Sequence, residues 1–145
     1  MKTRVLLLCV AVLSAAGSAG VRADDVTGAD RLICASIQAT ACTVDEDCVM
    51  ATPSDWNIPS FIEIDLAGKM LSTTAASGEP RATPIKHLER EDGLIMLQGS
   101  EAGRAFSFVV TEETGTISVA VARDGVTVSV FGACTPMPGA APAAK

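Results

Sequence analysis

Four cysteines carry the most specific chemistry in this chain, because their number and surroundings predict disulfide bonds. They follow an N-terminal segment with the features of a secretory signal and lie at Cys34, Cys42, Cys48 and Cys134. An even number of thiols in an exported chain indicates paired thiols. Cys42 and Cys48 flank a short polar stretch that can form a hairpin loop, so we expect these two to pair. Cys34 then pairs with Cys134.

Metal binding is the alternative chemistry for these thiols, but their spacing matches no zinc pattern. A second candidate ligand set is the acidic run Asp45, Glu46 and Asp47, since calcium prefers carboxylate oxygens. The run lacks the alternating ligand positions, the glycine and the distant glutamate of a calcium loop. We therefore expect a solvated acidic hairpin tip, with no metal and no cofactor.

His87 is the single histidine of the chain and the one candidate for a catalytic base. A serine nucleophile activated by histidine needs further partners that only the fold can supply, and the chain has no glycine-flanked serine elbow. Strand alternation around His87 indicates an exposed side chain. We therefore expect a protein that is not an enzyme, and a hydrolase using His87 is only a third hypothesis.

Trp56 is the one tryptophan and lies between Pro53 and Pro59. Two prolines prevent regular strand pairing, so this segment is predicted to be a loop. A lone tryptophan in such a loop can plug the end of a small barrel or can be an exposed anchor for a partner. We favour the plug, and we keep the anchor as the alternative.

The elements that position these residues are clearest in residues 93–134, where four strands are joined by short turns. Residues 116–122 and 126–132 are rich in Val, Ile and Thr and flank Arg123-Asp124-Gly125. The Asp-Gly pair suits a type I′ turn, which needs positive φ at both positions. That turn sets the register, which pairs Val121 with Val128 and Val119 with Val130.

The two preceding strands are predicted at residues 94–98 and 106–111, with a loop at 99–103 between them. Gly115 closes the following loop and fits a left-handed bulge position. We expect the large side chains of one strand to cover the small side chains of the next, which gives the sheet two partly apolar faces. The large residues are Phe106, Phe108 and Val110, and the small ones are Ser118, Ala120 and Ala122.

The first half of the chain adds shorter strands and no convincing amphipathic helix. They are predicted at residues 32–43, 48–52, 61–65, 69–73 and 81–89, the last pairing with 94–98. The fold class is therefore all-β: a small antiparallel meander of about eight strands that closes into a barrel or half-barrel. The bridge between Cys34 and Cys134 would tie the first strand to the last and stabilise this closure.

Residues 1–23 have the three parts of a secretory signal peptide. Lys2 and Arg4 precede an apolar run at residues 5–16, and small residues lie before Asp24, where we expect cleavage. The run is shorter than the roughly 20 residues of a membrane span, so no membrane anchor is expected after cleavage. We predict an exported bacterial protein, periplasmic or secreted. Residues 24–134 form one β domain, and residues 135–145 form a disordered tail rich in Pro and Ala.

Cleavage makes the chain strongly acidic. It removes Lys2, Arg4 and Arg22, so 8 of the 11 basic residues remain against 17 acidic ones, a net charge of −9. Such a chain repels nucleic acid and anionic lipid and attracts cationic partners. Acidity also keeps a secreted protein soluble, which is the simpler explanation.

The predicted plan resembles that of small exported β-barrel proteins, including lipocalin-like folds and periplasmic inhibitors of lysozyme or proteases. This resemblance implies architecture and compartment only. It carries over no functional residues, and the chain has no Tyr for the inhibitor motifs that contain one.

Two functions follow from these expectations. The first is a non-enzymatic binding or interaction module that engages a cationic protein through Asp45, Glu46, Asp47 and the loop at 89–92, with Trp56 near the contact. The second is a carrier of a small apolar ligand in the barrel interior, because barrels of eight strands can be solid or hollow.

The disulfide pairing is directly testable. Peptide mapping under non-reducing conditions should recover Cys42 linked to Cys48 and Cys34 linked to Cys134. A fragment that links Cys34 to Cys48 would contradict the predicted first hairpin.

Overall fold

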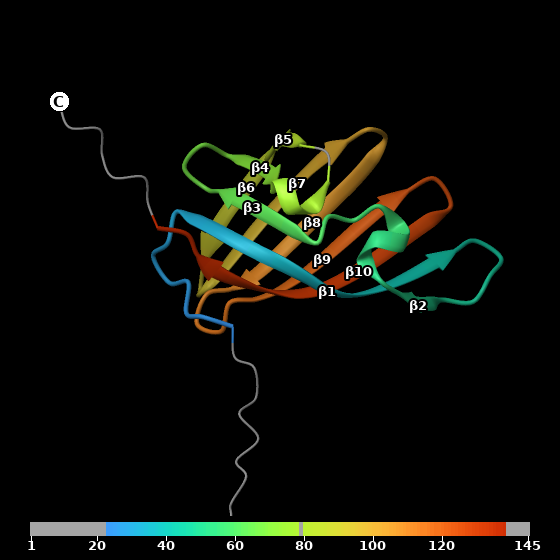
Figure 1. The fold of residues 1–145 in the computed structure, drawn as a ribbon, viewed down its shortest axis with the longest axis horizontal. Helices are drawn as coiled ribbons and strands as arrows, with labels where there is room; N and C mark the ends of the chain where they lie inside the picture. Colours follow the sequence, from blue (N-terminus) through green and yellow to red (C-terminus); the bar gives the residue numbers. More distant parts are fainter. Residues whose placement is uncertain (1–22, 79, 139–145) are drawn as a thin grey trace, which may run out of the picture.

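The computed structural model describes residues 23–78 and 80–138, so the predicted signal peptide up to residue 22 lies outside the described residues. These residues form one antiparallel sheet that curls into a half-barrel (Figure 1). In the described part of the chain, the strands are β1 (Arg31–Thr43), β2 (Val49–Ala51), β3 (Phe61–Asp65), β4 (Met70–Thr73), β5 (Ala82–Pro84), β6 (His87–Glu91), β7 (Leu94–Glu101), β8 (Arg104–Thr111), β9 (Thr116–Arg123) and β10 (Val126–Pro136). Two short 3₁₀ helices, η1 (Pro53–Trp56) and η2 (Ala75–Ser77), complete them. The all-β half-barrel is confirmed.

The two edge strands of the curled sheet follow each other directly in the chain. The strand order is β5-β4-β3-β1-β10-β9-β8-β7-β6, with β2 added to β1. Between β5 and β6, the Ile85 amide donates to the Lys69 carbonyl at 2.9 Å and the Lys86 amide donates to the Gln98 carbonyl at 2.8 Å. Residues 85 and 86, which connect β5 to β6, are therefore hydrogen-bonded on one side to the residue before β4 and on the other side to β7. At this point the two ends of the sheet are joined, so neither edge is free along its whole length.

On one side, strand β1 pairs with β10 along its whole length. On its other side, β1 pairs with β3 up to Ala35 and with β2 from Ala39. A bulge between Ser36 and Gln38 marks the change. Near it the two backbones come so close that a Cβ on Gly132 would lie 2.0 Å from the Ala35 carbonyl oxygen. Glycine is therefore required at this crossing.

The register predicted for the last hairpin is confirmed, but the predicted turn type is wrong. Val121 pairs with Val128 and Val119 pairs with Val130. Of the two turn residues, Gly125 has a positive φ of 68° and Asp124 does not. This fits a type II turn and not the type I′ turn expected there. Positive φ at both turn positions occurs instead at Asp92-Gly93 and at Ala102-Gly103.

The loop predicted at residues 99–103 is also wrong, because β7 continues to Glu101 and only Ala102 and Gly103 lie between the strands. Gly99 lies opposite Phe106 in this longer ladder. A glycine within a strand weakens it locally, which is why the sequence suggested a loop. Here the missing side chain leaves room for the Phe106 ring, since a Cβ on Gly99 would lie 2.4 Å from Phe106 Cζ.

The facing predicted for β8 needs a correction. The large side chains of β8 share a face with the valines and isoleucine of β9, since Phe106 pairs with Val121, Phe108 with Val119 and Val110 with Ile117. They do not cover Ser118, Ala120 and Ala122, which lie on the outer face. A register change of one residue moves every side chain to the other face. The sheet is therefore apolar mainly on its inner face.

The predicted strands in the first half of the chain are confirmed except at one point. Residues 81–89 do not form a single strand: Ala82–Pro84 pairs with β4 and His87–Glu91 pairs with β7. Pro84 has no amide proton to donate, so it suits the end of a strand at the sheet edge.

The tail was predicted to begin at residue 135, but Thr135 and Pro136 belong to β10. The Met137 amide also donates to the Arg31 carbonyl at 2.8 Å. The prediction of disorder is therefore wrong for these residues, and residues 139–145 lie outside the described residues.

Both predicted disulfides are present. Cys34 lies directly opposite Cys134 in the ladder between β1 and β10, with an S–S distance of 2.04 Å. Cys42 and Cys48 close the loop between β1 and β2. The first bridge holds together residues 100 positions apart in sequence, so it constrains the unfolded chain more than the second.

The segment before β1 closes one end of the half-barrel. Val26 is fully buried there, and its amide donates to the Glu112 carbonyl at 2.8 Å. The largely buried Glu112 carboxylate accepts hydrogen bonds from Nε (2.7 Å) and Nη2 of Arg90. Arg90 Nη1 also donates to the Ala29 carbonyl at 3.2 Å. One guanidinium therefore joins β6, the loop after β8 and the N-terminal segment.

We predict that Arg90→Ala lowers the free energy of unfolding by about 2 to 3 kcal/mol, because it leaves the Glu112 carboxylate without its charged donors. Urea unfolding followed by circular dichroism measures this change. Arg31→Ala is the matched control, since Arg31 and Glu63 lie 3.8 Å apart and both are more exposed. The control should cost less than about 1 kcal/mol, and equal losses in the two variants would contradict the prediction.

Candidate functional site

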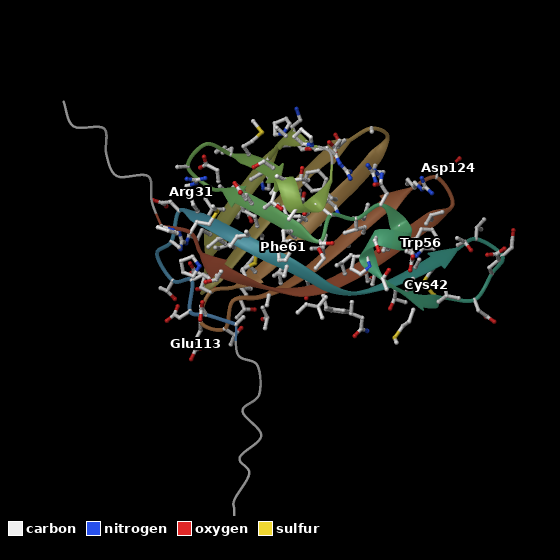
Figure 2. All side chains as sticks on the ribbon, viewed as in Figure 1. Arg31, Cys42, Trp56, Phe61, Glu113 and Asp124 are labelled. Atoms are coloured by element: carbon white, nitrogen blue, oxygen red, sulfur yellow. A yellow bond between two sulfur atoms is a disulfide. The ribbon has the colours of Figure 1, made fainter. Side chains whose placement is uncertain are left out.

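A half-open cavity lies at the other end of the half-barrel. Figure 2 shows Trp56 and Asp124 at one end of the molecule and Arg31 and Glu113 at the other. The cavity has a volume of about 120 Å³, where a single water needs roughly 10 to 15 Å³. Its lining comes from η1 and its following loop, from β3–β5 and from β7–β10. It has room for a small molecule.

The cavity wall is built of side chains that alternate inward along β7, β8, β9 and β10. Paired residues form layers across these strands. The deeper layer contains Leu97, Phe108, Val119 and Val130, which are buried, and the layer above it contains Gly99, Phe106, Val121 and Val128. The wall is therefore apolar from the packed core up to the mouth.

Phe106 shapes the middle of this wall. Its ring makes an edge-to-face contact with Phe108, with centroids 5.5 Å apart and planes at 80°, a geometry that aromatic pairs favour. Gly99 leaves the space into which the Phe106 ring extends. Phe106 is half-buried, so part of its surface is available to a molecule in the cavity.

Trp56 forms part of the mouth and not part of a strand. It ends η1, a helix whose start is held by the Asp55 carboxylate, which accepts hydrogen bonds from the Thr52 amide (2.9 Å) and hydroxyl (2.8 Å). Asn57 follows in the left-handed region at φ 54° and turns the chain. Trp56 is half-buried, packs against the core and lines the cavity. It therefore combines a packing contact with a surface that a ligand can touch.

Charged residues replace the apolar ones in the outermost layer of the wall. Arg104 continues the inward series of Phe106 and Phe108, and Arg123 continues that of Val119 and Val121. Glu101 lies opposite Arg104, and Val126 lies opposite Arg123.

A third guanidinium, that of Arg81, lines the same cavity from the segment before β5. Its Nη2 donates to the Asn57 side-chain oxygen at 3.2 Å, which connects it to the loop that carries Trp56.

The mouth is positive in a protein that is otherwise acidic. Three of the 7 described basic residues line the cavity, whereas one of the 16 described acidic residues does. Among residues 23–78 and 80–138, no carboxylate lies within 4.0 Å of the guanidinium nitrogens of Arg104 or Arg123.

The acidic residues singled out in the sequence lie outside the cavity. Asp45, Glu46 and Asp47 are exposed at the tip of the loop between β1 and β2. Glu46 accepts a hydrogen bond from the Thr43 hydroxyl at 2.9 Å, and the Val44 amide donates to the Gly125 carbonyl at 2.8 Å. The described residues contain no group of three or more His, Cys, Asp or Glu side chains arranged to hold a metal.

His87 lies on the outer surface of β6, where its side chain is 62% exposed. Its Nε2 lies 3.1 Å from a Glu89 carboxylate oxygen. His87 is not among the residues that line the cavity.

Sequence analysis missed the arginines of the mouth. The signal was the pair Ala102-Gly103: a two-residue turn there would have placed Arg104 opposite Glu101 and on the same face as Phe106. Arg81 could not have been found this way, because its place in the lining depends on the packing of segments that are distant in the sequence, such as its hydrogen bond to Asn57.

Comparison of the chain with protein-family models, with curated proteins and with solved structures finds no match. Within the described residues, no helix is long and apolar enough to cross a membrane. The two disulfides are consistent with an exported protein.

Proposed function

We propose that this protein binds a small, largely apolar molecule inside its half-barrel. The observation that carries the proposal is the half-open cavity whose wall is apolar along β7–β10 from the core to the mouth, with a few hydroxyl side chains from β4 and β5. Ligand sites are typically concave and mostly apolar, with a few polar groups that fix orientation. The protein would act as a binding protein or carrier of that molecule, without chemical conversion.

The surroundings of the cavity support a site that exists before the ligand arrives. Both disulfides, the Arg90–Glu112 pair and the β1–β10 ladder fix the frame around it. A frame that is already ordered reduces the entropy that binding would cost. We further propose that the protein works outside the cytoplasm, in the periplasm or after secretion, where a poorly soluble molecule benefits from a carrier.

Trp56 provides a direct test, because it is the one tryptophan and the chain has no tyrosine. Titration with octanol should shift and saturate the Trp56 fluorescence. Val119→Phe, which fills the cavity, should weaken octanol binding by about tenfold or more, since each buried methylene contributes about 0.8 kcal/mol. Val109→Phe on the outer face of β8 is the matched control and should leave binding unchanged.

Circular dichroism spectra of both variants should match that of the wild type. No saturable change in Trp56 emission with octanol would contradict the proposal. Equal weakening by the inner and outer phenylalanines would contradict the cavity as the place of binding.

A second candidate function is binding of a cationic protein through the loop between β1 and β2. Its three acidic side chains are exposed beside three exposed apolar ones, Val44 at 71%, Val49 at 52% and Met50 at 74%. The Cys42–Cys48 bridge holds the base of this loop. Exposed acidic and apolar groups on a braced loop suit a contact with a basic surface.

A pull-down from a native periplasmic extract tests this candidate at low and at high salt. A cationic partner should be captured at low salt, lost at high salt, and lost by the combined variant Asp45→Asn, Glu46→Gln and Asp47→Asn. Neutralising Glu89, Glu91 and Asp92 instead tests the other acidic loop. Partners that are indifferent to salt and to both sets of changes would count against the idea.

A further inference from the structure

We infer that the ligand is an anionic amphiphile, whose negative head group binds Arg104 and Arg123 at the mouth while its apolar chain enters the cavity. This inference rests on the proposed ligand binding and adds the chemical class of the ligand. Three observations support it: the register of β8 and β9, the charge of the side chains that line the cavity, and the position of the arginines above the apolar layers of the wall.

The register places two arginines side by side. Ala105 pairs with Ala122, so Arg104 and Arg123, one residue further toward the strand ends, lie at opposing positions. Both belong to the inward-facing series of their strands and both line the cavity. Like charges directly opposite each other destabilise a sheet. An anion between them would turn this repulsion into attraction.

The charges around these two arginines leave the mouth positive. Arg81 adds a third guanidinium, and Glu101 is the one acidic side chain among the described residues of the lining, so these residues carry a net charge of +2. The chain after residue 23 has a net charge of −9. A cationic ligand would find one carboxylate among three guanidinium groups, which disfavours that class.

The chemistry of arginine suits the proposed head group. Guanidinium donates planar pairs of hydrogen bonds to carboxylates, sulfates and phosphates. Arg104 and Arg81 are half-buried, and partial exclusion of water strengthens their attraction for an anion.

The apolar layer with Phe106 and Val121 lies directly beneath Arg104 and Arg123. The arrangement therefore fixes the orientation of the ligand: the charged head at the mouth and the chain toward Phe108.

Calorimetric titration with octanol, octanoate, octyl sulfate and octylammonium separates the head groups on one chain length. Octanoate and octyl sulfate should bind about tenfold tighter than octanol, and octylammonium should bind most weakly. Arg104→Gln and Arg123→Gln should each weaken octanoate by about tenfold and leave octanol within about twofold. Arg31→Gln at the opposite end is the matched control and should change neither ligand.

Glu101→Gln supplies an independent variant with the opposite sign. It removes the acidic side chain that lies opposite Arg104, so it should tighten octanoate by about twofold to threefold and leave octanol unchanged. If an arginine variant fails to fold, unchanged or weaker octanoate binding to Glu101→Gln overturns the inference.

Octanol that binds as tightly as octanoate in the wild type would overturn the inference and leave the proposed apolar site intact. Equal weakening of octanol and octanoate by the arginine variants would overturn it too. If neither octanol nor octanoate binds, the proposed function fails and this inference fails with it.

Discussion

The pairing of β1 with β10 is the contact on which the rest of the structure depends. It turns a meander into a curled sheet, and the Cys34–Cys134 bridge crosses it at directly opposing residues. At the bulge near Ser36, β1 changes its partner from β3 to β2, and η1 with Trp56 lines the cavity. The same strand therefore closes the frame and leaves its mouth open.

Inside this frame, composition changes with depth. The closed end contains Val26 and the Arg90–Glu112 pair, the middle is packed with aliphatic side chains and Phe108, and the mouth has arginines. The apolar middle and the positions of Arg104 and Arg123 follow from the alternation of side chains along four strands in register. An apolar interior that ends in arginine side chains fits a molecule with an apolar chain and an anionic head.

Much of the fold could be predicted from sequence, because the signals were local. Alternation and the Asp124-Gly125 turn gave the register of the last hairpin. The four cysteines after residue 23, with the short polar stretch between Cys42 and Cys48, predicted both bridges. The errors also have local causes. Gly99 is typical of a loop but lies within β7, and an error of one residue in the register between β8 and β9 placed Phe106 on the wrong face. The Arg90–Glu112 pair and the place of Arg81 join distant segments, so no sequence pattern could predict them. Among the residues at the mouth of the cavity, the sequence identified Trp56 as a candidate but not the arginines.

A crystal structure of the protein with ω-bromooctanoate bound would test the central claim, that the inner face of the half-barrel is a ligand site with a charged mouth. Anomalous scattering locates the bromine at the end of the chain. We predict a bromine peak within the cavity near Phe108 and Val119, with the carboxylate between Arg104 and Arg123. A peak on the outer face near Phe61, or a carboxylate that lies away from these arginines, would contradict the account.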